Sequence, residues 1–165
     1  MTASLMSLAR ELLTICGEKR LKVATAESCT GGLVAAAITD VPGASSVFER
    51  GFVTYSNEAK RELLGVAEET LRTHGAVSRE TAREMADGAL ARSNADLAVS
   101  VTGVAGRDGG SVEKPVGLVH FACARAGGDL VSVERRFGSL SREEIRAKAA
   151  AQALVMLLDA ARVRP

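Results

Sequence analysis

Segments with helical periodicity alternate with short apolar segments through most of this 165-residue chain. Apolar residues recur at spacings of three and four residues in three long segments, which predicts helices over 5–17, 79–93 and 141–162. The segment from Leu97 to Thr102 (LAVSVT) is almost continuously apolar, as expected for a strand that is covered on both faces. The alternation therefore predicts a layered α/β domain with a mainly parallel sheet.

Shorter elements complete this prediction. Strands are expected over 22–26, 47–55, 117–124 and 130–137, and short helices over 33–38 and 57–64. The last two strands flank Ala126-Gly127-Gly128-Asp129, which predicts an antiparallel hairpin toward one edge of the sheet. Hydroxyl side chains that precede predicted helices are candidate N-caps, namely Thr30, Ser56, Ser78 and, in a capping box with Glu144, Ser141. We expect one domain over residues 1–165.

The composition argues against several classes of function. Lys and Arg number 21 and Asp and Glu number 20, and aromatic residues make up only 3%, so we expect no nucleic-acid partner. No apolar run approaches the roughly 18 residues that a membrane-spanning helix needs. The first twenty residues carry charges within a helical pattern, unlike a secretory signal.

The cysteines predict a reducing compartment. Cys16, Cys29 and Cys123 are odd in number and far apart, so they form neither a disulfide framework nor a CxxC metal motif. With only two histidines in the chain, we expect no metal site. The cytoplasm is the expected location.

The first motif that suggests chemistry is AESCTGG over residues 26–32, at a turn from a predicted strand to a predicted helix. A serine at the carboxyl end of such a strand is exposed to ligands, and the N–H groups of the following helix start can bind an oxyanion or a phosphate. Ser28 is therefore a candidate nucleophile, with Cys29 as its rival. The alternative is structural, because Ser and Thr cap helices, Gly-Gly forms turns and an isolated Cys usually packs in a core.

The second motif places the only tyrosine of the chain, Tyr55, at a strand end, and Lys60 about one turn into the next helix. A serine nucleophile needs a base, and a lysine whose pKa is lowered by burial can serve. Tyr55 could relay a proton or orient the lysine. The alternative is a solvated surface lysine beside a core tyrosine.

The third motif is TGVAGRDGG over residues 102–110, which follows the most apolar strand. Its glycines could present N–H groups to an anion, although it is neither a Walker A nor a dinucleotide motif; the alternative is a surface loop. Arg142 and Arg146 lie one turn apart in the last helix and could bind a phosphate together. Their alternative is an ordinary solvated helix face.

Five motifs together resemble the CinA C-terminal domain family, namely AESCTGG, PGASS, ERGFVTYSNEAK, TGVAGRDGG and KPVG. Stand-alone members of that family are nicotinamide-nucleotide amidohydrolases. The resemblance implies a three-layer α/β/α sandwich. It also implies that the chain deamidates nicotinamide mononucleotide to nicotinic acid mononucleotide and ammonia, which recycles pyridine nucleotides.

The same resemblance implies which residues act. Ser28 is the implied nucleophile, and Lys60 and Tyr55 are its implied activating partners. The implied substrate-binding residues are Thr30, Gly31, Ser45, Thr102, Gly103, Gly106, Arg142 and Arg146. No cofactor is implied, the partner is a small nucleotide, and the expected assembly is a homodimer. The alternative function is that of a non-catalytic module that binds a nucleotide or a protein partner.

Overall fold

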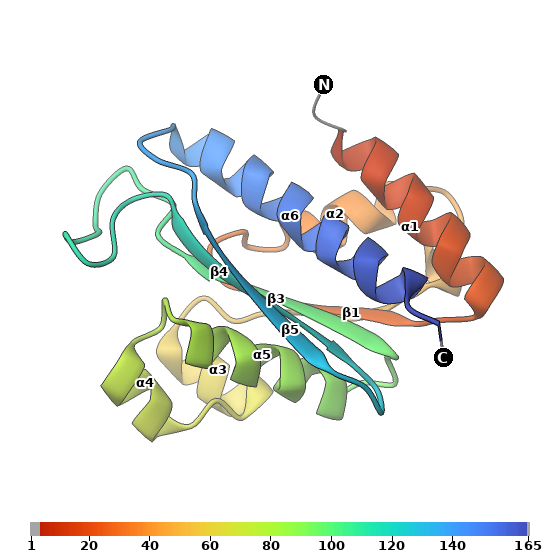
Figure 1. Cartoon of the computed structure of the whole chain (residues 1–165), viewed down its shortest axis with the longest axis horizontal. Helices are drawn as coiled ribbons and strands as arrows, with labels where there is room; N and C mark the ends of the chain where they lie inside the picture. Colours follow the sequence, from red (N-terminus) through yellow and green to blue (C-terminus); the bar gives the residue numbers. More distant parts are fainter. Residues whose placement is uncertain (1–3, 165) are drawn as a thin grey trace.

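A five-stranded sheet with helices on both faces forms the centre of the computed structural model, which describes residues 4–164 (Figure 1). The strands are β1 (Val23–Glu27), β2 (Phe48–Val53), β3 (Leu97–Gly103), β4 (Leu118–Arg125) and β5 (Leu130–Arg136). Helices α1 (Leu5–Lys19), α2 (Leu33–Thr39) and α6 (Arg142–Arg162) cover one face. Helices α3 (Asn57–Leu64), α4 (Glu68–His74) and α5 (Arg79–Ala91) cover the other. The predicted three-layer α/β/α sandwich is confirmed.

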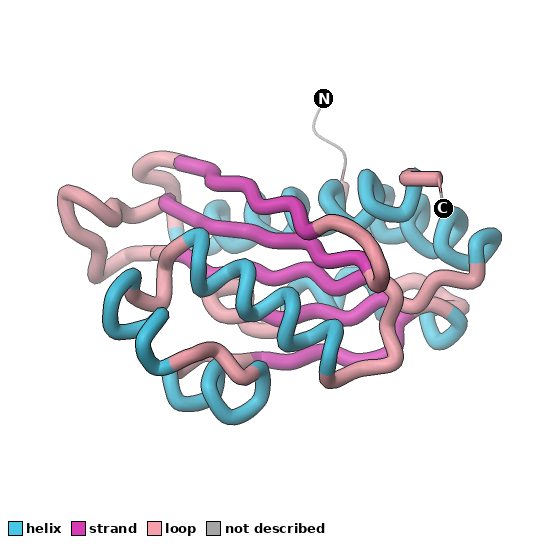
Figure 2. The backbone as a smooth tube through the Cα atoms, turned by 60° about the horizontal axis from the view of Figure 1, so that its bottom comes forward, coloured by secondary structure: helices cyan, strands magenta, loops and turns pink. Residues whose placement is uncertain are grey.

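The sheet combines parallel and antiparallel pairs in the order β2-β1-β3-β4-β5 (Figure 2). Strand β1 pairs in parallel with both β2 and β3. Strands β3, β4 and β5 then pair antiparallel, and β4 and β5 form the predicted hairpin at one edge. Four of the five strands consequently run in one direction, so the prediction of a mainly parallel mixed sheet holds.

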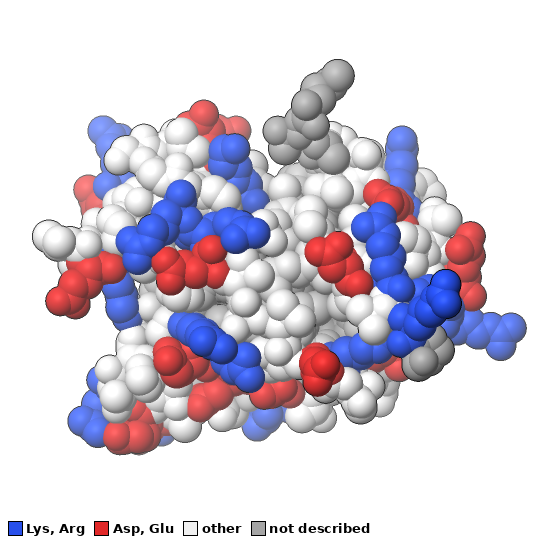
Figure 3. All heavy atoms as spheres, in the orientation of Figure 1, with Lys and Arg blue, Asp and Glu red and all other residues white. Residues whose placement is uncertain are grey.

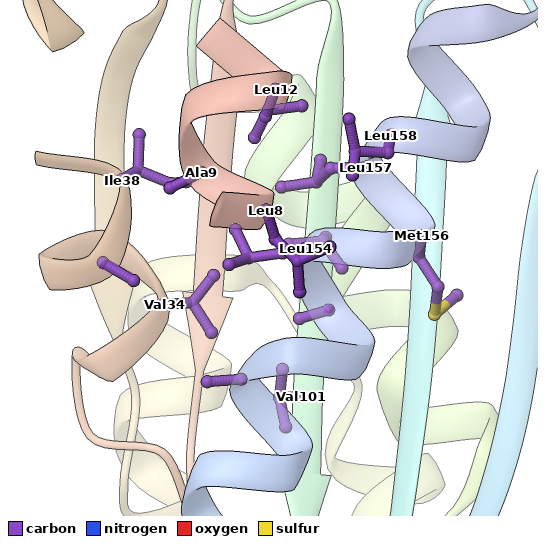
Figure 4. Packing of buried hydrophobic residues seen from close by; sticks show 14 of the residues in the cluster. Leu8, Ala9, Leu12, Val34, Ile38, Val101, Leu154, Met156, Leu157 and Leu158 are labelled. Carbon is purple, nitrogen blue, oxygen red and sulfur yellow. The ribbon is translucent and has the colours of Figure 1, made fainter. Parts of the chain in front are cut away.

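The larger part of the core lies between the sheet and the layer of α1, α2 and α6. Leu8 and Leu12 of α1 pack beside Leu154 and Leu157 of α6, as Figure 4 shows. Aliphatic side chains at helical spacing thus meet an almost wholly apolar strand layer, which explains why these segments form helices. Small buried side chains let the long helix α6 pack closely on its neighbours, and they are Ala149, Ala150, Ala153 and Ala161.

The opposite face is packed mainly with small residues. Ala82 and Ala86 of α5 lie against Ala122 and Ala124 of β4. Helix α5 also packs closely on α3, because Gly88 lies directly over the last residue of that helix. The abundance of alanine and glycine in the sequence is therefore used for close packing of helices on the sheet and on each other.

Replacing Gly88 with alanine is expected to destabilise the fold. A Cβ at this position would lie 1.9 Å from the Leu64 carbonyl oxygen, so α3 and α5 would have to move apart. Overpacking of this kind costs about 1–3 kcal/mol of unfolding free energy. Urea unfolding measures the change.

Gly17 offers the matched control, since it also lies within a helix but a Cβ there would meet no atom within 4 Å. Gly17→Ala is expected to raise the unfolding free energy by up to about 1 kcal/mol, because alanine favours a helix over glycine. Equal effects of the two substitutions would contradict the packing described for Gly88.

Most of the predicted helix caps are present. Ser56, Ser78 and Ser141 each accept a hydrogen bond from a main-chain N–H in the first turn of their helices, and Ser141 forms the predicted capping box. The prediction that Thr30 caps α2 is wrong. The helix begins after Gly32, which has no side chain, and the buried Glu27 carboxylate instead accepts hydrogen bonds from the N–H groups of Val34 and Ala35.

Smaller differences concern the connections. The segment 42–46 contains a short 3-10 turn (Ala44–Ser46), and the sequence did not predict α4. Within residues 4–164, no helix combines the length and the apolar character needed to cross a membrane. Basic and acidic residues lie interspersed around an uncharged central band on the face shown in Figure 3.

Candidate active site

Three parallel strands end at the same edge of the sheet, and the segments that follow them carry the site. Ser28 comes directly after β1, Thr54 directly after β2, and the glycine-rich loop directly after β3. In Figure 1 this loop (teal) projects from the same side as the start of α6. The carboxyl ends of parallel strands are where open α/β sheets bind ligands, as the sequence motifs predicted.

Ser28 and Lys60 form a buried hydrogen-bonded pair. The Lys60 amine lies 2.9 Å from Ser28 Oγ, and the lysine side chain, held at the start of α3, belongs to a residue only 1% exposed. The amine also donates to the carbonyl oxygens of Thr54 at 2.8 Å and Tyr55 at 3.4 Å. When the amine is neutral, these two carbonyls hold its two protons, so its lone pair faces the serine hydroxyl.

Burial sets the protonation of this pair. It lowers the pKa of Lys60 from 10.5 to about 8, because the charged ammonium loses hydration. Burial raises the pKa of the neighbouring Cys29 thiol from 9.0 to about 11. Near neutral pH, Lys60 therefore has an appreciable neutral fraction, whereas Cys29 remains a thiol and a poor nucleophile. This contrast favours Ser28 over Cys29 as the reacting group.

Tyr55 contributes through two different groups. Its main-chain carbonyl contacts the Lys60 amine, while its side chain belongs to a residue 61% exposed and its hydroxyl accepts a hydrogen bond from Arg142 at 2.9 Å. Arg142 also donates to the carbonyl oxygen of Gly106. The guanidinium thus joins the segment after β2 to the glycine-rich loop. Among the described residues, the Tyr55 phenol has no hydrogen bond to Lys60 or Ser28.

A cavity of about 260 Å³ opens beside the serine–lysine pair. It is lined by Ser28, Cys29, Tyr55, Lys60, Ala76, Val77, Thr102, Gly103, Val104, Ala105, Gly106, Asp108 and Arg142. Seven of the predicted site residues are in this lining, and they come from four separate segments of the sequence. Motifs that lie far apart in the sequence thus line one cavity in the structure.

Thr102 and Gly103 shape the wall of this cavity. The Thr102 hydroxyl donates to the carbonyl oxygen of Ala76 at 2.7 Å, which holds the segment before α5 against the site. A Cβ at Gly103 would lie 2.7 Å from Val119 and 2.9 Å from the Leu118 carbonyl oxygen. Only glycine fits there without displacing β4.

The other predicted substrate-binding residues do not line the cavity. Thr30 and Gly31 belong to the turn after Ser28. The guanidinium of Arg146 donates hydrogen bonds to main-chain carbonyl oxygens of that turn. Ser45 lies in the exposed 3-10 turn that precedes β2, at the amino ends of the parallel strands. Ser45 therefore does not line the described cavity, because its motif falls at the opposite edge of the sheet, and its part in substrate binding stays a prediction.

Main-chain N–H groups around Ser28 differ in availability. The N–H of Gly31 donates to the Ser28 carbonyl and that of Leu33 to the Thr30 carbonyl. The Glu27 carboxylate accepts hydrogen bonds from the next two N–H groups, those of Val34 and Ala35. Within residues 4–164, the N–H groups of Cys29, Thr30 and Gly32 have no hydrogen-bond acceptor. These three are the donors that remain for an anionic group beside Ser28, and of the three residues Cys29 lines the cavity.

Two contributors were missed in the sequence. Glu27 occupies a buried strand and is only 1% exposed, so a charged residue in an apolar run was the available signal. The Thr54 carbonyl gave no signal, because any residue supplies a main-chain oxygen. In the part of the chain that the structure describes, no group of three His, Cys, Asp or Glu side chains is arranged to hold a metal ion.

This chain is similar to known proteins by family model, by sequence and by fold. The family model of the CinA C-terminal domain matches residues 5–161. The nicotinamide-nucleotide amidohydrolase PncC of Escherichia coli K12 is 52% identical over 155 residues, which cover 94% of this chain and 93% of that protein. A putative competence-damage inducible protein of Caldicellulosiruptor bescii is 57% identical over 135 residues, but the match covers only 33% of its length.

A solved structure shares the fold over almost all of both chains. The competence/damage inducible protein CihA of Agrobacterium tumefaciens superposes with a TM-score of 0.93 at 52% sequence identity, covering 96% of this chain and 98% of the other. The family model, the relatives and the shared fold lead to one conclusion: this chain belongs to the CinA C-terminal domain family.

Proposed function

We propose that this chain hydrolyses the carboxamide of nicotinamide mononucleotide to give nicotinic acid mononucleotide and ammonia. The observation that carries the proposal is the 2.9 Å contact between Ser28 Oγ and the buried Lys60 amine beside an open cavity. The activity named for the E. coli relative, which this chain matches over 93% of its length, supports the choice of substrate.

Acylation begins with the Lys60 amine in its neutral form. The amine takes the Ser28 proton while Oγ forms a bond to the carboxamide carbon, and the N–H groups of Cys29 and Thr30 stabilise the oxyanion. The lysine ammonium then gives its proton to the amide nitrogen. The C–N bond breaks, ammonia leaves, and an ester joins Ser28 to the nicotinoyl group.

Deacylation repeats these steps with water. Lys60 takes a proton from the water while the water oxygen attacks the ester carbon, and the Ser28 oxygen recovers that proton as the C–O bond breaks. Arg142 lines the cavity and remains our candidate phosphate contact. Arg146 does not have that role in our proposal, because its guanidinium already donates to two carbonyl oxygens of the turn.

Ammonia release by the purified protein tests the proposal. We expect release from nicotinamide mononucleotide, and much slower release from nicotinamide or from its riboside, which lack the phosphate. Binding of the nucleotide without turnover would favour the non-catalytic module. Faster release from another phosphorylated ribosyl amide would keep the chemistry and change the substrate.

The rate of the reaction is expected to rise with pH. Only the neutral form of Lys60 can accept the serine proton, and burial places the pKa of that amine at about 8. The ratio kcat/KM should therefore increase from pH 6 and level off above the pKa, with a midpoint near 8. Rate measurements from pH 6 to 9.5, with circular dichroism to show that the fold persists, provide the check. A flat profile would contradict the role of Lys60.

We place the protein in a reducing cytoplasm and expect a homodimer there. The three cysteines are all free and buried, which supports the first expectation. Light scattering on the purified protein determines the oligomeric state.

A further inference from the structure

We propose that Arg146 is a positioning residue that orients the Thr30 N–H as an oxyanion donor. This inference rests on the proposed function, since it concerns the donors next to Ser28. It gives Arg146 a place in the reaction different from the phosphate contact that the sequence suggested.

The contacts of Arg146 are directed at the main chain of the turn after Ser28. Its Nε donates to the Cys29 carbonyl oxygen at 3.1 Å, and its Nη2 donates to the Thr30 carbonyl oxygen at 3.0 Å. The side chain reaches this turn from the second turn of α6, more than a hundred residues along the chain. One planar guanidinium therefore holds two consecutive carbonyl groups in one orientation.

Peptide geometry relates these carbonyls to the N–H groups opposite them. The bond between Cys29 and Thr30 is trans, since the only cis peptide in the described chain lies elsewhere, between Gly106 and Arg107. In a trans peptide the C=O and N–H groups point in opposite directions. Holding the Cys29 carbonyl toward α6 therefore turns the Thr30 N–H away from α6, and this N–H has no acceptor within residues 4–164.

The positive charge of Arg146 also favours donation of a hydrogen bond by the Thr30 N–H. None of the ion pairs in the described residues includes Arg146, so its cationic group faces carbonyl oxygens without a neutralising carboxylate. A cation bound to a carbonyl polarises the peptide and makes its N–H a better donor. The oxyanion next to Ser28 would therefore be stabilised more strongly than by an uncharged turn.

Gly31 is adapted to this contact. It has φ of +59°, and a Cβ there would lie 3.5 Å from Arg146 Nη2. A longer side chain would extend into the space of the guanidinium. The first glycine of the motif thus allows both the tight turn and the contact with Arg146.

The experiment compares Arg146→Ala and Arg146→Lys with Arg162→Ala. Arg162 is the matched control because it lies on the same helix but pairs with Glu11 and Asp159, away from the site. We expect Arg146→Ala to lower kcat by about a hundredfold, the usual effect of losing one oxyanion donor, with KM changed less than threefold. Arg146→Lys should keep part of the rate, and Arg162→Ala should match the wild type.

Two readouts separate positioning from general stability. Added guanidinium ion should raise kcat of Arg146→Ala and leave Arg162→Ala unchanged, while the midpoint of the pH profile stays near the Lys60 pKa of about 8. A rate for Arg146→Ala within threefold of wild type overturns the proposal. So does a loss of rate that guanidinium does not restore and that Arg146→Lys shares in full.

The rate at which a fluorophosphonate labels Ser28 distinguishes failure of this proposal from failure of the proposed function. The phosphonyl oxygen would use the same N–H donors but needs no nucleotide. If the wild type releases no ammonia, the proposed function fails, and slower labelling of Arg146→Ala than of Arg162→Ala still supports the role of Arg146. Equal labelling of the two variants contradicts that role.

Discussion

Replacing Ser28 with alanine is expected to lower kcat for nicotinamide mononucleotide by at least about a thousandfold, the usual cost of removing a nucleophile. The variant keeps the cavity and the main-chain donors but has no oxygen to attack the carboxamide. Because the acyl ester cannot form, the residual rate should be that of direct attack by water. Ammonia release under single-turnover and steady-state conditions measures both the loss and the absence of an acyl intermediate.

Cys29→Ala is the control for this prediction, since it removes the rival nucleophile at the next position. Its thiol is buried and its pKa is raised to about 11, so we expect kcat within about tenfold of the wild type, the loss coming from packing around the turn. The opposite ranking, with Cys29→Ala inactive and Ser28→Ala active, would transfer the nucleophile to Cys29. Mass spectrometry of acylated peptides would identify the residue directly.

Replacing Lys60 with methionine is expected to have the second large effect on the rate. The variant fills nearly the same volume but cannot take the Ser28 proton, so kcat should fall by about a thousandfold or more. The dependence of the residual rate on pH near 8 should also disappear, because the titrating amine is gone. Lys148→Met is the control, since Lys148 is an exposed lysine of α6.

The same substitution should change how stability depends on pH. Burial lowers the pKa of Lys60 from 10.5 to about 8, so between these values the unfolded chain binds a proton that the folded chain does not. The unfolding free energy of the wild type therefore gains a favourable contribution as the pH rises through this window. Below pH 8 the folded protein bears the cost of a buried ammonium, so Lys60→Met should be at least as stable there.

Urea unfolding at pH 7 and pH 10 measures this difference. The stability of the wild type relative to Lys60→Met should increase between the two pH values, while the difference between wild type and Lys148→Met stays constant. A constant difference for Lys60→Met as well would show that burial does not lower the pKa of the Lys60 amine. The amine would then be almost fully protonated near neutral pH and unable to act as the proposed base.

Much of the fold could be predicted because its elements repeat a simple pattern. The apolar run of β3 and the helical spacing of α1, α5 and α6 gave their positions to within a few residues. Helix α4 was missed because only one of its seven residues, Leu71, is buried, so it has almost no apolar periodicity. Its formation depends on contacts with α5, which a local pattern does not contain.

The candidate site was predicted less evenly. Ser28 and Lys60 stood at strand and helix ends with a clear chemical purpose, and the structure brings them together. The role of Arg146 could not be deduced, because its partners are carbonyl oxygens of Cys29 and Thr30 that no residue type reveals. Ser45 was suggested only by the family resemblance, and it lies in a turn that precedes β2, so it does not share the edge of the sheet where Ser28 lies.

The main-chain contacts of Lys60 have a consequence for how this protein can evolve. The base is held by the carbonyl oxygens of residues 54 and 55, and these oxygens persist whatever side chains those positions carry. Mutations that alter the Tyr55 side chain, and with it the rim of the cavity, leave the anchoring of the amine in place. If the proposed serine–lysine chemistry operates, the rim can therefore diversify toward other ribosyl amides while that chemistry is inherited unchanged.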